Sequence, residues 1–244
     1  MAALFALRKL ATAVNRAWER LEADQKEAKR VSDLPFTFRA PNNVNSIPQI
    51  YPEGFRPNLV IHERDLEFAF GARGELAGWS WDASTTYGSN RASENTSNTL
   101  NASLGPTSPT SFYVGTLKST ENVTSLDLTR AFELENAGQL QLSFGVQHRH
   151  ETYKVAPGEP LSYAAGTYVI PAGQPFAGQR PATGAQATPG FQPSDASSSS
   201  RDSFAAYVEL GWTANDRFFL GGAARYENYD DSSGDTLVGK VTAR

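Results

Sequence analysis

The sequence predicts an all-β fold, namely an antiparallel, up-and-down segment of a transmembrane β-barrel. About six or seven strands would form an open, curved sheet, with an amphipathic helix in front of them. Three observations support this prediction: apolar and polar side chains alternate with a period of two, short and long connections alternate, and aromatic residues end the apolar faces. Hydrophobic residues make up only 39% of the 244 residues, and no apolar run reaches the roughly 18 residues of a transmembrane helix. A barrel tolerates this composition because only alternate residues of its strands must be apolar.

The composition excludes several kinds of protein. No cysteine is present, so a disulfide scaffold, a thiolate metal site and a cysteine nucleophile are excluded. The net charge of −4 gives no indication of a nucleic-acid partner. The first residues are apolar but are interrupted by Arg8 and Lys9, whereas a secretory signal carries its charge before its apolar stretch. A signal peptide is therefore not recognisable.

Residues 4–30 have the periodicity of one helix. Its apolar stripe recurs at steps of three and four residues and consists of Leu4, Leu7, Ala11, Val14, Trp18 and Leu21. We expect this stripe to dock on another surface; a membrane-surface helix is the alternative, disfavoured because acidic residues dilute the basic face. Residues 41–60 carry four prolines and no periodicity, which indicates an extended linker or loop. We therefore divide the chain into residues 1–40, helix and linker of unknown role, and a β-domain of residues 41–244.

Six later segments alternate as half-buried strands do, and a seventh, Thr236–Arg244, follows them. One face of these strands is apolar and includes Leu66, Phe68, Phe70, Trp79, Trp81, Leu126, Leu128, Leu140, Leu142, Phe144, Val146, Val208, Leu210, Trp212, Phe218 and Leu220. The other face is polar and includes Asp65, Glu67, Asp82, Asp127, Gln139, Gln141, Gln147, Glu209, Arg225 and Glu227. These polar groups cannot all be buried in a dry core, but they can line a hydrated lumen while the apolar face meets lipid.

The connections and the aromatic residues favour a membrane barrel over a soluble sheet. Tight turns are predicted at Glu75–Gly78, Leu134–Gly138 and Thr213–Asp216, and long loops at Ser89–Glu121 and Ala156–Asp202. Outer-membrane barrels have this alternation of short periplasmic turns and long external loops. Trp79, Trp81, Phe132, Trp212 and Phe218 lie beside the turns, and Tyr87 and Tyr226 follow eight residues further along two of the strands. Aromatic rings favour both membrane interfaces at about this spacing.

Several motifs resemble the barrel of TonB-dependent outer-membrane receptors. The clearest is Gly221-Gly-Ala-Ala-Arg-Tyr-Glu-Asn-Tyr-Asp230, which is similar to the family's strand pattern G-x-R-Y-E-x-Y-S/D and is followed by Gly239-Lys-Val-Thr-Ala-Arg244. Phe144-Gly-Val-Gln-His-Arg-His-Glu-Thr-Tyr153 resembles another strand. Gly78-Trp-Ser-Trp-Asp-Ala-Ser-Thr-Thr-Tyr-Gly88, with Asn101-Ala-Ser-Leu-Gly-Pro106 in its loop, resembles a third. The resemblance covers about residues 41–244.

The resemblance implies part of a receptor and transporter in the bacterial outer membrane, not an enzyme. Its partners would be outer-membrane lipid, a small extracellular ligand of the iron–siderophore type at the long loops, and a TonB complex acting through a plug domain. The family's barrel has about 22 strands around a plugged lumen, whereas the plug, the TonB box and the terminal strand are not recognisable here. We therefore expect a truncated chain that does not transport alone. No catalytic, cofactor-binding or metal-binding residue is expected.

Some residue groups could carry chemistry, but each has a more ordinary interpretation. His148 and His150, next to Glu151, would lie on one face as a possible divalent-metal pair, yet a third ligand is not evident. The long loop of residues 156–202 holds Tyr163, Tyr168, Phe176 and Phe191, which could contact a ligand or pack the loops on themselves. Asp230, Asp231 and Asp235 lack the spacing of an EF-hand and indicate a solvated turn.

Two further hypotheses stay open at this point. A secreted or surface β-sandwich that binds carbohydrate would show the same alternation, and it would place Leu140, Leu142 and Phe144 against a dry core. A non-functional gene fragment would share the predicted fold without the activity.

Overall fold

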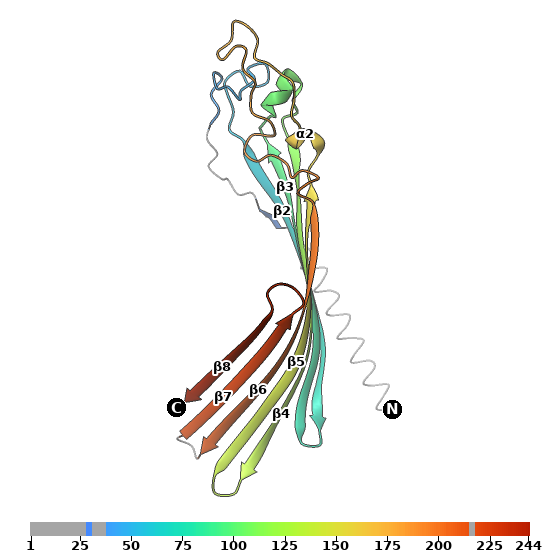
Figure 1. Cartoon of the computed structure of the whole chain (residues 1–244), viewed down its shortest axis with the longest axis vertical. Coiled ribbons are helices and arrows are strands. Elements are labelled where there is room, and N and C mark those ends of the chain that lie inside the picture. Colours follow the sequence, from blue (N-terminus) through green and yellow to red (C-terminus); the bar gives the residue numbers. More distant parts are fainter. Residues whose placement is uncertain (1–27, 31–37, 215–217) are drawn as a thin grey trace, which may run out of the picture. The chain divides into compact units, whose positions relative to one another are not determined.

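The computed structural model describes residues 28–30, 38–214 and 218–244, whose strands form one sheet in chain order (Figure 1). The strands are β1 (Ala28–Arg30), β2 (Asn58–Leu76), β3 (Trp79–Ser97), β4 (Phe112–Leu134), β5 (Gly138–Pro157), β6 (Ser197–Ala214), β7 (Phe218–Tyr229) and β8 (Asp235–Ala243). The 3₁₀ helix η1 (Ala102–Thr107) follows β3, and the short helix α2 (Pro160–Tyr163) follows β5. No helix of the described residues is long and apolar enough to cross a membrane.

The strands pair as an antiparallel meander. From β6 to β7, for example, the paired residues run from Ser203 opposite Tyr229 to Ala214 opposite Phe218. Because β1 and β8 are the two ends of the strand order, the described sheet is open. The predicted all-β fold, with consecutive antiparallel strands in an unclosed sheet, is therefore confirmed.

The helix predicted for residues 4–30 lies almost entirely outside the described residues. Its last three residues, Ala28–Arg30, form β1, which pairs antiparallel with Ile61–Glu63 of β2. For these three residues the prediction is wrong. The edge of β2 has unpaired N–H and C=O groups that bind this segment, and the spacing of apolar residues gives no information about such pairing.

The strands are longer, and the loops shorter, than the alternation predicted. β3 continues to Ser97 and β4 begins at Phe112, so the connection between them is residues 98–111. β5 continues to Pro157 and β6 begins at Ser197, so the second long connection is residues 158–196. The end of β3 and the start of β6 carry polar residues on both faces, as in the run Ser197–Ser200, and β4 begins with Phe112, Tyr113 and Val114 in succession. A two-residue period is therefore not visible in these strand ends.

The tight turns have backbones suited to their residues. Ala77 and Gly78, between β2 and β3, both have positive φ angles, of 53° and 79°, as a two-residue hairpin turn of type I′ requires. Asn136 and Gly138, at the β4–β5 turn, have φ angles of 59° and 87°. Residues 215–217 of the third turn lie outside the described residues. The order and antiparallel direction of the strands place successive connections at alternate ends of the meander, as predicted.

The chain divides into two compact units, which we call the loop unit and the sheet unit. The described residues of the loop unit fall within 1–66, 90–119 and 153–198, and those of the sheet unit fall within 67–89, 120–152 and 199–244. The loop unit has a buried apolar cluster of Ile47, Phe55, Leu100 and Ala102. Two of these residues come from the proline-rich segment 41–60, which is thus a packed part of the unit.

The two faces of the sheet unit separate as the alternation predicts. On the apolar face, Trp79 packs edge-on against Phe132 and Phe144, at ring-centroid distances of 6.2 and 5.4 Å. On the polar face, Thr129 Oγ1 donates to Ser143 Oγ at 3.0 Å. These contacts come from strand positions of opposite parity, so each face is continuous over neighbouring strands.

The apolar face is open to its surroundings. Phe144 is 37% exposed and Leu210 is 47% exposed, while Leu140 and Leu142 are partly exposed. Among the described residues, therefore, the dry core that a soluble β-sandwich would require on this face is not present. Large exposed apolar surfaces of this kind mark a contact with lipid or another protein.

Candidate functional site

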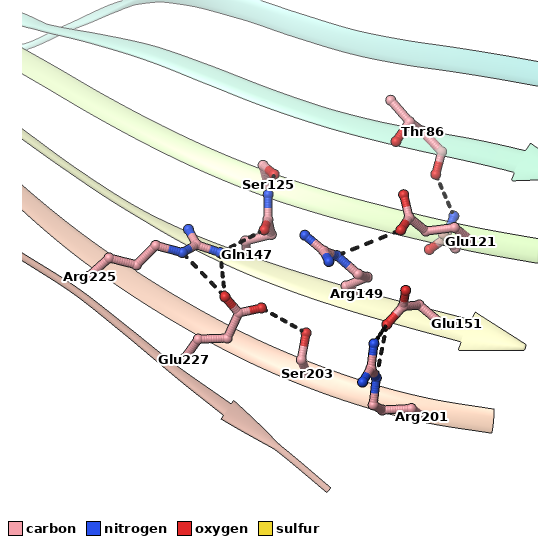
Figure 2. A network of polar contacts seen from close by, with 11 residues as sticks. Thr86, Glu121, Ser125, Gln147, Arg149, Glu151, Arg201, Ser203, Arg225 and Glu227 are labelled. Carbon is pink, nitrogen blue, oxygen red and sulfur yellow. Dashed lines mark hydrogen bonds and ion pairs between the residues drawn. The ribbon is translucent and has the colours of Figure 1, made fainter. Parts of the chain in front are cut away.

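The polar face of the sheet unit carries a ladder of hydrogen bonds across β4 to β7 (Figure 2). Arg225 Nη2 donates to Gln147 Oε1 at 2.9 Å and to Glu227 Oε2 at 3.2 Å. Gln147 Nε2 continues the ladder to Ser125 Oγ at 3.2 Å, and Ser203 Oγ donates to Glu227 Oε1 at 3.2 Å. The side chains predicted to line a lumen are thus paired with one another, which lowers the cost of placing charges on this face.

Two further arginines extend the ladder along the same strands. Arg201 Nε donates to Glu151 Oε2 at 3.0 Å, and Arg201 Nη1 lies 3.7 Å from a carboxylate oxygen of Asp231. Arg149 Nε lies 3.9 Å from Glu121 Oε2, beyond hydrogen-bond distance (Figure 2). This nitrogen is buried and has no hydrogen-bond partner among the described residues. The side chains of these ion pairs are partly exposed, so each pair stabilises the sheet by only about 0–1 kcal/mol.

A tyrosine on β6 reaches across β5 to an aspartate on β4. Tyr207 Oη donates to Asp127 Oδ1 at 2.6 Å. The residue of β5 beneath this bond is Gly145; a Cβ built there would lie 2.5 Å from Tyr207 Cε1 and closer still to Asp127 Oδ1. The bond therefore requires glycine at this position, which lies within the motif Phe144–Tyr153.

The two histidines lie on one face of β5, as their spacing predicted, and this is the apolar face of the sheet unit. His148 Nε2 and His150 Nδ1 both lie against a single oxygen, Asp202 Oδ1, at 2.9 and 3.0 Å. His148 also stacks on Phe204, with ring centroids 4.5 Å apart. Glu151 points to the other face and binds Arg201 instead. No group of histidines and carboxylates among the described residues could hold a metal ion. The two histidines and Asp202 instead form hydrogen bonds that link β5 to β6.

The aspartates after β7 form a turn and not a calcium loop. Asp231 Oδ1 accepts a hydrogen bond from the Ser233 amide at 2.9 Å, while Asp230 Oδ1 accepts one from the Asp202 amide, also at 2.9 Å. Asp235 accepts from the hydroxyl of Tyr226 at 3.2 Å. The Ser233 amide, the Ser233 hydroxyl and the nearby Arg201 guanidinium hold the pKa of Asp231 below its ordinary value. The three carboxylates serve different partners, as the solvated-turn prediction expected.

A buried asparagine joins the two long connections in the loop unit. Asn101 is fully buried, and its Nδ2 donates to the carbonyl oxygens of Leu161 and Ala164 at 3.0 and 2.8 Å. Its Oδ1 accepts from the amide and the hydroxyl of Ser103 at 3.2 and 2.7 Å, and its amide donates to Ser108 Oγ at 2.8 Å. One side chain therefore joins residues 98–111 to residues 158–196 by hydrogen bonds to backbone groups of both connections.

The aromatic residues of the second loop divide between packing and exposure. Tyr168 packs against the buried apolar cluster, over Gly105, whose φ of 64° also favours glycine. Phe191 packs against Gly115 of β4. For these two rings the ordinary interpretation, packing of the loops on themselves, is correct. Phe176 remains 45% exposed and Tyr163 is partly exposed.

The loop unit also has a hollow of about 380 Å³ that is largely open to solvent. Its walls come from β2, from the end of β3, from the start of β4 and from Glu159, which precedes α2. Glu159 Oε1 accepts a hydrogen bond from the Tyr113 amide at 3.2 Å, which fixes the carboxylate at the wall. This hollow could not be predicted from the sequence, because its residues come from four separate segments.

The profile of one protein family spans nearly this whole arrangement of strands and loops. It is the family described as "TonB dependent receptor-like, beta-barrel", and it matches residues 13–244. The chain belongs to this family. Members of the TonB-dependent receptor family are receptors and transporters of the bacterial outer membrane and not enzymes. No curated protein sequence and no solved structure matches the chain significantly.

Membership of the family accounts for the motifs in the sequence, but the roles of their residues come from the structure. The family match begins at residue 13, upstream of residue 41, where the motif resemblance begins. Within the motifs, Gly145 admits the Tyr207–Asp127 bond and Asn101 joins two loops. Asp202, which the two histidines contact, lies outside every motif. Only the pairing of β5 with β6 brings it to them, so no local signal in the sequence could have identified it.

Proposed function

We propose that this chain is the barrel portion of an outer-membrane receptor, with the sheet unit spanning the membrane and the loop unit collecting ligand outside. One observation carries the proposal: the sheet unit exposes large apolar side chains on one face and pairs its polar side chains on the other. A soluble sheet would bury the apolar face, whereas a barrel wall turns it toward lipid. Membership of the TonB-dependent receptor family supports the same orientation.

The ligand we propose is a scarce small molecule of the iron–siderophore type. Support comes from the family and from the loop unit, in which Asn101 holds two long connections as one body with Phe176 exposed on it. An ordered set of loops can recognise a small ligand at a lower entropic cost than mobile loops. The partners we propose are those of the family: outer-membrane lipid and a TonB complex that acts through a plug domain.

Neighbouring residues of β6 provide the test of membrane orientation. Because the chain has no cysteine, Leu210→Cys and Glu209→Cys each introduce a single thiol, one on each face. In outer membranes isolated from cells, we expect the thiol at 209 to react with a water-soluble maleimide. The thiol at 210 should react about tenfold more slowly and should instead take a lipid-soluble maleimide. Equal labelling of both positions by the water-soluble reagent would refute a lipid-facing apolar surface.

Uptake of iron complexes tests the proposed ligand separately. Cells that produce the chain, and cells that lack it, would be given ferric hydroxamate or ferric catecholate labelled with radioactive iron. We expect cell-associated iron to rise only with the chain present, and to fall when the membrane potential that energises TonB is collapsed. Equal uptake in both strains for both chelates would remove the siderophore assignment while leaving the membrane orientation intact.

A further inference from the structure

One arginine lies on the apolar face of the sheet unit, at the end of its strands. Arg130 of β4 has the same parity as Phe132, and its guanidinium carbon lies 4.9 Å from the centroid of that ring and 5.8 Å from that of Trp79. Its Nη1 donates to the carbonyl oxygen of Ala77 at 3.3 Å. A Cβ built at Gly78 would lie 3.3 Å from the guanidinium carbon. The cation therefore lies directly beside the tight turn between β2 and β3.

The rings next to Arg130 hold the guanidinium and leave most of its donors without partners. Trp79 packs edge-on against both Phe132 and Phe144, so the aromatic surface is fixed by its own contacts. A guanidinium that lies over aromatic faces is attracted through its plane and keeps its N–H groups for other partners. Arginine has five N–H groups, and one of them, on Nη1, has an acceptor among the described residues. The other donors are available to a group from the surroundings.

The charge of Arg130 is not balanced by the sheet. On the polar face, Arg149, Arg201 and Arg225 each form an ion pair with a glutamate. Arg130 forms no ion pair with a carboxylate of the described residues. A cation among apolar side chains is costly unless an anion accompanies it. The position of Arg130 therefore indicates an anionic partner that comes from outside the described sheet.

The proposed membrane orientation identifies this anion. The short turns of an outer-membrane barrel lie at the periplasmic interface, where aromatic rings and long cationic side chains meet the lipid headgroups. We propose that Arg130 binds the phosphate of one phospholipid of that leaflet, whose acyl chains lie along the apolar face. Two N–H groups of the guanidinium donate to two phosphate oxygens, the bidentate geometry that arginine and phosphate favour. The binding rests on the proposed membrane orientation and is independent of the proposed iron–siderophore ligand.

Native mass spectrometry of the full chain in a nonionic detergent tests the site. The probes are dilauroylphosphatidylglycerol, dilauroylglycerol, which lacks the phosphate, and glycerol phosphate, which lacks the acyl chains. We expect the phospholipid to bind at least about tenfold more tightly than either of the others. Equal binding of the phospholipid and one of the other probes would overturn the proposal, with the lipid-facing surface unaffected. Binding of neither lipid would also overturn it, and maleimide labelling at residues 209 and 210 would then show whether the membrane orientation fails too.

Substitutions assign the binding to Arg130 itself. Arg130→Gln removes the charge from a partly exposed side chain and should weaken the phospholipid about tenfold. Arg130→Lys keeps the charge without the planar fork and should weaken it about threefold. The matched control is Arg73→Gln, which removes the same charge from an exposed position of β2 that the alternation places on the polar face, and should change binding by less than about twofold. Equal effects of the two glutamine variants, or no effect of Arg130→Gln, would place the phosphate elsewhere and overturn the proposal.

Discussion

The phenol of Tyr207 donates a 2.6 Å hydrogen bond to Asp127 Oδ1 across an intervening strand. Tyr207 lies on β6 and Asp127 on β4, so the bond passes over β5 at Gly145. Strand pairing through the backbone joins only neighbours, and this side-chain bond adds a link between strands that are two apart. Its existence depends on the absence of a single Cβ atom.

Gly145→Ala is expected to destabilise the sheet unit by about 1–3 kcal/mol, since the new methyl group displaces the ring and leaves Asp127 without its donor. The matched control is Gly222→Ala on β7, where a Cβ meets nothing within 4 Å. Urea unfolding in detergent or lipid vesicles would measure both. In a Tyr207→Ala background the cost of Gly145→Ala should largely vanish. An equal effect of both alanines would contradict the steric explanation.

Asn101→Ala should loosen the two long connections of the loop unit. The substitution leaves the carbonyl oxygens of Leu161 and Ala164 without the Nδ2 donor, at about 1–3 kcal/mol for each group that stays unpaired. Chymotrypsin cleavage after the exposed Phe176, which is followed by Ala177, would report the loosening, because cleavage follows the population of the opened loop. We expect cleavage at least about tenfold faster. The exposed Asn42→Ala in the same unit is the control, and equal cleavage of both variants would refute the role given to Asn101.

The sequence allowed the faces of the sheet to be predicted because a side chain's face follows from its own position in the alternation. Leu142 and Gln141 needed no knowledge of their neighbours. The full length of β3 and β4 could not be predicted from the alternation. The end of β3 is polar on both faces, and β4 begins with Phe112, Tyr113 and Val114 in succession, so neither segment has a two-residue period. The partners of His148 could not be predicted either, because Asp202 is 54 residues away and meets it only through strand pairing.

The buried cluster of the loop unit shows the same limit. Ile47 and Phe55 come from a segment whose prolines indicate a linker, and the apolar residues there follow no period. Their burial depends on Leu100 and Ala102 from the connection after β3. Turn residues were easier to predict, since Gly78 and Gly138 adopt the positive φ angles that glycine favours.

Acid should weaken the turn between β7 and β8 through Asp231. Hydrogen bonds from Ser233 hold its pKa below the ordinary value of about 3.9. A carboxyl with a lowered pKa contributes stability that is complete above the unfolded-state pKa and is lost as pH falls through the folded-state pKa. The difference in unfolding free energy between the natural chain and Asp231→Asn should therefore be constant above about pH 5 and shrink at lower pH. A difference that is independent of pH, or that grows in acid, would contradict this assignment.

The last prediction is that this chain by itself does not form a conducting barrel. The described strands make an open sheet whose edges are β1 and β8. Closing so few strands would give a narrow barrel with an interior just wide enough for side chains. Asp127, Arg225 and Glu227 would then crowd into that interior, at a cost of several kcal/mol for any charge left unpaired.

We therefore expect no discrete single-channel steps when the purified 26.5 kDa chain is added to planar bilayers, and no shift in gel mobility on heating. A closed eight-stranded barrel of similar mass, treated in parallel, should show the mobility shift. This control protein excludes failed refolding as the reason for a negative result. The unpaired edge groups should also leave β8 amides open to hydrogen exchange, since β8 has a partner on one side only among the described strands. Steady conductance steps together with a heat-modifiable monomer would show that the chain closes on itself, and that the polar face tolerates confinement.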